Sequence, residues 1–175
     1  MHTTRKAGRV ALAMCLVAAV FPATAARLEF QGGPSYMGNH ATSAAFVEGV
    51  FDGHRVGDSN FSWSPDVSLG WIEGRDLARY RGNRYSTSED AWLLAAGARV
   101  HYGTADDWYR HLFVSFQPAL NSARTQALST AYEFVSTLGW QGQRFSVQVR
   151  HVSNGNLHHP NRGETMLLLG VGFEL

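Results

Sequence analysis

The sequence predicts an all-β protein, an eight-stranded antiparallel transmembrane β-barrel of the outer membrane. Beyond the first 25 residues, apolar and polar residues alternate with a period of two in eight segments, which is typical of strands with one apolar face. Several segments are about 10 to 12 residues long, and about 9–11 tilted residues cross a bilayer. Aromatic residues gather near the segment ends, as they do at membrane interfaces. They are Trp63, Trp71, Trp92, Tyr102, Trp108 and Trp140.

The N-terminal segment has the pattern of a secretory signal peptide. Three basic residues and no acidic residue precede an apolar run of eleven residues, Val10 to Val20, which is too short to span a membrane as a helix. Ala23-Thr24-Ala25 then supplies the small residues of a cleavage site. We therefore predict a signal peptide over residues 1–25 and a single β-barrel domain over residues 26–175, with cleavage after Ala26 as the alternative.

The composition of the mature chain excludes several classes of protein. The single cysteine, Cys15, lies in the signal peptide, so the mature chain forms no disulfide. Residues 26–175 carry 12 Arg, no Lys and 14 Asp plus Glu, and this slightly negative balance argues against nucleic acid as a partner. No later run of about 18 apolar residues predicts a transmembrane helix.

The alternation also predicts which residues face the lipid and where the strands are connected. The clearest outward faces are the odd positions from Trp63 to Trp71 and the even positions from Trp92 to Tyr102. Pro65 indicates a strand start or a bulge. If both termini face the periplasm, the connections after the first, third, fifth and seventh strands are extracellular. They are predicted at Gly33–Ala41, Glu73–Asp90, Pro118–Ala127 and Asn154–Glu164.

A candidate active site lies at the end of the seventh strand. His151 and Ser153 share the parity of the lipid-facing residues before them, and residues i and i+2 of a strand lie about 6.5–7 Å apart on one face. An imidazole and a hydroxyl so placed can act as general base and nucleophile of a serine hydrolase, with a carboxylate to orient the imidazole. Glu164 is the best candidate, because it starts the next strand of the same hairpin. The pair would lie on the outer wall at the extracellular rim, where it meets a substrate already in the membrane.

The residues after Ser153 could stabilise an oxyanion. Asn154, Gly155 and Asn156 offer side-chain and backbone N–H donors for an oxyanion hole. The alternative interpretation is that Ser-Asn-Gly is ordinary turn chemistry and His151 a solvated interface residue. An ionisable side chain on a lipid-facing parity favours the functional interpretation.

The run His151-Val152-Ser153-Asn154, followed by Pro160-Asn161 and by Glu164 before a last apolar strand, resembles the lipid A 3-O-deacylases. These are small eight-stranded outer-membrane barrels of Gram-negative bacteria. The resemblance implies hydrolysis of the 3-O-linked acyl ester of lipid A (lipopolysaccharide) in the outer leaflet, without a cofactor or metal. It implies a triad of His151, Ser153 and Glu164, with Asn154 in the oxyanion hole. The family has a glycine three residues after the serine, where this sequence has Asn156.

Other interpretations remain open at this point. His-x-Ser-Asn-Gly also resembles outer-membrane phospholipase A, a calcium-dependent enzyme with a twelve-stranded barrel; a non-enzymatic small outer-membrane barrel and a secreted ligand-binding barrel are further alternatives. His158-His159 does not indicate a metal site, because adjacent residues rarely chelate one ion. The sequence leaves open whether the barrel is a monomer or a homodimer.

Four arginines of the second predicted extracellular loop could contact substrate phosphates: Arg75, Arg79, Arg81 and Arg84.

Overall fold

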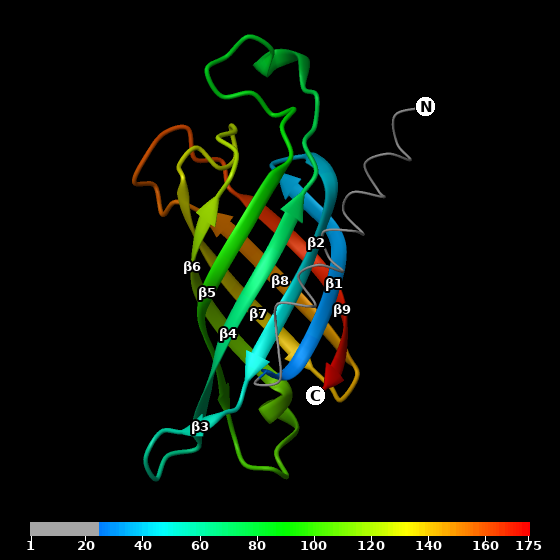
Figure 1. Cartoon of the computed structure of the whole chain (residues 1–175), viewed down its shortest axis with the longest axis vertical. Helices are drawn as coiled ribbons and strands as arrows, with labels where there is room; N and C mark the ends of the chain where they lie inside the picture. The colour runs from blue at the N-terminus through cyan, green and yellow to red at the C-terminus, as the bar shows by residue number, and fades with distance from the viewer. Residues whose placement is uncertain (1–24) are drawn as a thin grey trace.

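The computed structural model describes residues 25–175, so the predicted signal peptide, apart from Ala25, lies outside the described residues. None of the described residues forms a helix long and apolar enough to cross a membrane. Eight long strands, one short strand and two short 3-10 helices make up this part of the chain (Figure 1). In order they are β1 (Ala25–Met37), β2 (His40–Phe51), β3 (His54–Arg55), β4 (Phe61–Ile72), η1 (Ala78–Tyr80), β5 (Ala91–Tyr102), η2 (Trp108–His111), β6 (Leu112–Asn121), β7 (Tyr132–Gln141), β8 (Phe145–Ser153) and β9 (Glu164–Glu174).

The eight long strands close into the predicted antiparallel barrel. Each strand pairs with its neighbour in the order β2-β1-β9-β8-β7-β6-β5-β4, and β2 pairs with β4 to complete the ring. The closing register runs from Ala44 opposite Ile72 to Val50 opposite Asp66. Three connections, residues 73–90, 122–131 and 154–163, lie at one end of the barrel, which we call the loop end (Figure 1). The C-terminus and β3 lie at the opposite end.

The alternation of inward and outward faces is confirmed, and it is most regular in β6 and β8. In β6 and β8, exposed and buried residues alternate without interruption. The exposed positions include Phe116, Leu120, Val147 and Val149, whereas Gln148 and Arg150 point inside and are buried. This alternation gives the barrel an apolar outer wall and a polar interior, as in membrane barrels.

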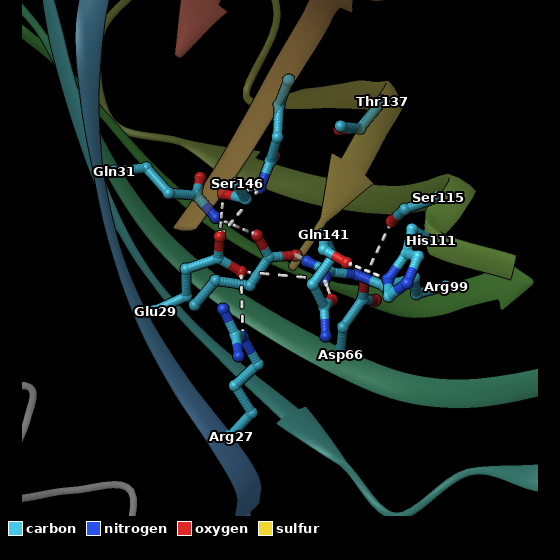
Figure 2. Close-up of polar contacts among 12 residues, drawn as sticks. Arg27, Glu29, Gln31, Asp66, Arg99, His111, Ser115, Thr137, Gln141 and Ser146 are labelled. Carbon is cyan, nitrogen blue, oxygen red and sulfur yellow. Dashed lines mark hydrogen bonds and ion pairs between the residues drawn. The ribbon is translucent and has the colours of Figure 1, made fainter. Parts of the chain in front are cut away.

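The barrel interior holds a network of buried charges. Glu48 lies between Arg99 and Arg150, with N···O distances of 3.3 and 2.8 Å, and all three side chains are fully buried. Figure 2 shows the neighbouring part of this network, in which Arg99 also approaches Glu29 at 3.7 Å and Ser115 donates to Asp66 at 2.7 Å. Charges removed from water are costly unless they are paired and hydrogen-bonded. The interior therefore holds paired charges beside a cluster of buried apolar side chains that includes Phe46 and Leu168.

The first predicted connection was placed wrongly. Gly33–Ala41 is mostly strand, because β1 runs to Met37 and β2 starts at His40, so the turn is only Gly38–Asn39. Gly33 does not form a turn. It allows β1 and β9 to approach closely, since a Cβ there would collide with the backbone of Leu167 on β9.

Two prolines also lie within strands, although the sequence indicated a strand start or a bulge at Pro65 and a connection beginning at Pro118. Pro65 pairs with Ala98 inside β4, and it lies just before Asp66, where pairing with β2 ends. Pro118 lies inside β6, so the connection predicted at Pro118–Ala127 is shifted to residues 122–131. Both residues lack an N–H, and each occupies a position where one neighbouring ladder is interrupted. Leu128 is buried in that connection.

Candidate active site

His151 and Ser153 lie on the outward face of β8 at the loop end, as the parity predicted. His151 is exposed and Ser153 is half-buried, whereas Val152 between them is fully buried. β8 ends at Ser153 and continues into the connection 154–163. The two side chains therefore lie on the outer wall of the barrel, within the last three residues of β8.

Polar residues of the two neighbouring strands flank His151. Ser136 of β7 and Thr165 of β9 lie directly opposite it in the two ladders. Thr165 Oγ1 lies 3.0 Å from His151 Nδ1, at hydrogen-bond distance. The three side chains form a short polar row across an otherwise apolar wall.

Gly163 bounds the other side of the imidazole. A Cβ added to this residue would lie 2.8 Å from His151 Cε1 and 3.2 Å from Nε2, so the ring rests against the glycine backbone. The β8–β9 ladder ends where Val152 faces Glu164, and Ser153 and Gly163 are the next residues beyond this end of the ladder. The Nε2 edge of the ring is therefore directed toward the Ser153 end of the hairpin, while Nδ1 meets Thr165.

The structure does not bring Glu164 to His151, contrary to the expectation of a His151, Ser153 and Glu164 triad. Glu164 begins β9, as predicted, but it pairs with the inward Val152 and is itself buried. Its carboxylate accepts hydrogen bonds from Arg75 at 2.8 and 2.9 Å and from Ser35 at 2.6 Å. A step of one residue along a strand changes the face of the barrel, so the carboxylate points inside while the imidazole points outside.

Asn154 also faces the interior, so its donors are already used. Its side chain is fully buried, and Nδ2 donates to His158 O at 2.9 Å and to Ser129 Oγ at 3.3 Å. Its backbone N–H donates to Asn161 Oδ1 at 3.2 Å. The expected contribution of Asn154 to an oxyanion hole is not supported by this arrangement.

Gly155 and Asn156 form a tight turn directly after Ser153. Their φ angles are 65° and 66°, and Leu157 N–H donates to Asn154 O at 3.3 Å, which is the pattern of a type I′ turn. Glycine adopts positive φ without strain, and asparagine tolerates it better than most residues. Within residues 25–175, no acceptor is found for the backbone N–H of either residue, so these two donors can serve an oxyanion.

The four predicted phosphate-binding arginines have different surroundings. Arg75 is buried against Glu164. Arg81 pairs with Asp76 at 2.5 Å on the exposed loop, and this guanidinium holds the pKa of Asp76 below its usual value. Arg79 and Arg84 instead lie over the rings of Tyr80 and Tyr85.

A fifth arginine, which the sequence analysis missed, joins the same surface. Arg162, from the connection before β9, lies 5.2 Å from the centroid of the Tyr80 ring, and Arg79 lies 4.6 Å from it. His158, of the His-His pair, hydrogen-bonds to Tyr85. The two loops therefore meet through side chains, and they bring exposed guanidinium groups together at the loop end.

The sequence contained a signal for Thr165 that was not used. Leu167 and Leu169 lie on the outer face of β9, and counting back in steps of two places Thr165 on that face. The same count places Glu164 inside, with Leu168. Ser136 and Gly163 could not be assigned in this way, because their proximity to His151 depends on strand pairing.

Comparison with known proteins agrees with this architecture. The family model described as lipid A 3-O-deacylase (PagL) matches residues 46–174. A solved structure described as the crystal structure of the outer membrane enzyme PagL superposes with a TM-score of 0.58 at 14% identity, covering 86% of this chain and 100% of that chain. A search of curated proteins found no match.

The match and the fold together decide between the alternatives left open by the sequence. The ring of eight long strands differs from the twelve-stranded barrel that a resemblance to phospholipase A implies. The family model spans most of the barrel, including all of the β8–β9 hairpin that carries His151 and Ser153. The chain belongs to the lipid A 3-O-deacylase (PagL) family of outer-membrane β-barrel hydrolases.

Proposed function

We propose that this protein hydrolyses the 3-O-linked acyl ester of lipid A, with Ser153 as the nucleophile and His151 as the general base. The observation that carries the proposal is the placement of this pair on the outward face of the barrel, within the last three residues of β8. An ionisable side chain at such a position is energetically costly, and residues of this kind are therefore usually functional. The site would face the outer leaflet, where the ester bonds of lipid A lie beside the wall.

The reaction follows the steps of a serine hydrolase. His151 Nε2 takes the proton of the Ser153 hydroxyl as Oγ forms a bond to the ester carbonyl carbon. The backbone N–H groups of Gly155 and Asn156 donate hydrogen bonds to the carbonyl oxygen and stabilise the negative charge that develops on it. The bond to the sugar oxygen then breaks, and the imidazolium returns the proton to that oxygen. Water, deprotonated by the same imidazole, attacks the acyl carbon; the bond to Ser153 Oγ breaks, and the imidazolium returns the proton to Oγ as the fatty acid leaves.

An apolar groove beside the pair suits the hydrocarbon part of such a substrate. Phe134 of β7 pairs with Ser153, and its ring stacks on Phe116 with centroids 5.8 Å apart. Phe134 also lines a groove of about 390 Å³ on the outer wall, together with Leu94, Pro118 and Leu120. An acyl chain lying in this groove would have its carboxyl end near Ser153, and this supports a lipid ester as substrate.

Replacement of Ser153 tests the proposal directly. Expression of the wild-type protein in a Gram-negative host should produce lipid A that lacks one 3-hydroxyacyl chain in mass spectra, and Ser153→Ala should abolish this loss. Ser136→Ala is the matched control, because Ser136 is also an outward serine beside His151. Heat-modifiable migration in gels would confirm that both variants fold. Deacylation by the folded Ser153→Ala protein, or its loss in Ser136→Ala alone, would overturn the assignment of the nucleophile.

The arginines at the loop end favour a phosphorylated substrate. Arg79 and Arg162 converge on Tyr80 from two loops, and no carboxylate pairs with either within residues 25–175. We infer that they, with Arg84, contact the phosphates of lipid A, whereas Arg75 and Arg81 are held by carboxylates. Arg79→Gln combined with Arg162→Gln should raise KM for bisphosphorylated lipid A several-fold and leave kcat unchanged. Arg81→Gln is the control, and an equal rise in KM there would contradict the distinction.

A further inference from the structure

We propose that Thr165 is the positioning residue of His151 and occupies the place that a carboxylate holds in a serine-hydrolase triad. This inference rests on the proposed function, because it concerns the base of that same reaction. It arises from one contact, the 3.0 Å approach of Thr165 Oγ1 to His151 Nδ1, and from the strand register that enforces it.

The register makes the contact a fixed feature of the hairpin. Directly opposed residues of an antiparallel pair point to the same face with Cβ atoms about 4.5–5.5 Å apart. His151 and Thr165 are such a pair in the β8–β9 ladder, which continues through six further pairs to Phe145 opposite Val171. A change of partner would require the whole hairpin to slip, which would turn buried residues such as Met166 and Leu168 to the outside.

The contact also fixes which nitrogen of the imidazole meets the threonine. A neutral imidazole has one N–H donor and one bare acceptor nitrogen. When Nδ1–H donates to Thr165 Oγ1, Nε2 is left bare on the edge of the ring that lies against Gly163, across from Ser153. A hydroxyl can accept from Nδ1–H or donate to a bare Nδ1, so Thr165 holds the ring orientation that the reaction requires in either tautomer.

A hydroxyl is a neutral partner, and this distinguishes the site from a triad with a carboxylate. Within residues 25–175, no carboxylate contacts the His151 ring; the nearest in sequence, Glu164, is bound to Arg75 and Ser35 inside the barrel. Thr165 can orient the imidazole, but it adds no negative charge to stabilise the imidazolium that forms during the reaction. Catalysis therefore depends on the hydroxyl for geometry alone.

The test compares two substitutions of the same residue in the full-length protein, purified in detergent and assayed with lipopolysaccharide. Thr165→Val keeps the shape and removes the hydroxyl, and it should lower kcat by roughly 10–100-fold with little change in KM, which is part of the total effect of acid–base catalysis. Thr165→Ser restores the hydroxyl and should stay within about threefold of wild type. A fluorophosphonate probe, which reports activation of Ser153 without lipid binding, should label Thr165→Val more slowly by the same factor.

The possible outcomes separate this inference from the proposed function. Wild-type kcat in Thr165→Val, or an equal loss in Thr165→Ser and Thr165→Val with heat-modifiable folding intact, would overturn the role of Thr165. If in the same experiment Ser153→Ala remains inactive, the proposed function still holds. If Ser153→Ala is as active as wild type, the proposed function itself fails.

Discussion

At the scale of single residues, the position of the His151 imidazole depends on two neighbours. Thr165 contacts its Nδ1 atom, and Gly163 leaves room for the ring because it has no side chain. The ring lies so close to Gly163 that a methyl group there would come within 2.8 Å of Cε1. Gly163 also has a φ of 67°, and its N–H donates to Ala127 O at 3.0 Å. The backbone at this position is therefore fixed, and any added side chain must displace the imidazole.

Gly163→Ala should therefore reduce deacylation by more than tenfold in a protein that still folds. Positive φ in a non-glycine residue costs about 1 kcal/mol, which is a small part of the stability of a barrel. Gly38→Ala is the matched control, since Gly38 has a similar φ of 58° but nothing within 4 Å of its added Cβ. Lipid A mass spectra and urea unfolding of both variants would separate the two effects. Equal loss of activity in both variants would mean that backbone strain, and not displacement of His151, is responsible.

At the scale of secondary-structure elements, Glu164 joins three segments at the loop end. Its carboxylate binds Arg75 of the connection 73–90 and Ser35 of β1, and all three groups are largely buried. Two backbone hydrogen bonds connect the same loops: Gln126 N–H donates to Ser86 O, and Arg162 N–H donates to Gln126 O. The three long connections are thereby tied to one another over the barrel mouth, and the hairpin that carries His151 and Ser153 is fixed at its open end.

Loss of one partner of this ion pair should destabilise the loop end. Arg75→Met leaves the Glu164 carboxylate buried without its cation, and breaking such a pair costs roughly 3–5 kcal/mol. Arg81→Met removes an exposed arginine of the same loop, and we expect no measurable change because exposed ion pairs contribute little. Urea unfolding in detergent, followed by tryptophan fluorescence, measures both. A similar midpoint for the two variants would contradict the importance of the buried pair.

Glu164→Gln provides a separate test of the role of this carboxylate in the reaction. Because Glu164 faces the interior and His151 the outside, the folded variant should deacylate lipid A within about threefold of wild type. Its activity should be measured beside that of Ser153→Ala, with heat-modifiable migration as the control for folding. Inactivity of a folded Glu164→Gln protein would restore this residue to a catalytic triad.

At the scale of the whole molecule, stability depends on the charges inside the barrel. Arg99 and Arg150 are two of the largest fully buried side chains, and each also covers an interior aromatic ring, Phe113 at 3.9 Å and Phe46 at 4.5 Å. Glu48 is the anion that the two guanidinium groups share. The non-adjacent strands β2, β5 and β8 are thus joined through the barrel interior as well as around its wall.

Glu48→Gln should lower the free energy of unfolding by roughly 3–5 kcal/mol, because it leaves two buried cations without their shared anion. Asp52→Asn makes the same chemical change on an exposed turn and should have no measurable effect. Unfolding by urea would compare the two. An unchanged midpoint for Glu48→Gln would show that other groups, such as Glu29 near Arg99, compensate for the lost charge.

Much of this fold could be predicted, because alternation within a strand is a local property. The faces of β6 and β8, the closed antiparallel architecture and the outward placement of His151 and Ser153 follow from the two-residue period. The ends of β1, β2 and β6 were predicted less well. Gly33 and Pro118 have the local preferences of turn residues, but the tertiary structure uses them where strands approach closely or where a ladder is interrupted.

The sequence by itself determined that this chain is a β-barrel with a histidine and a serine on one outward face. Only the tertiary structure decided which residues serve that pair. Thr165, and not Glu164, meets His151, because pairing between strands is set by contacts along the whole hairpin and a step of one residue reverses the face. Likewise, Asn154 and Arg75 are used inside the loop end, because their partners come from segments distant in the sequence.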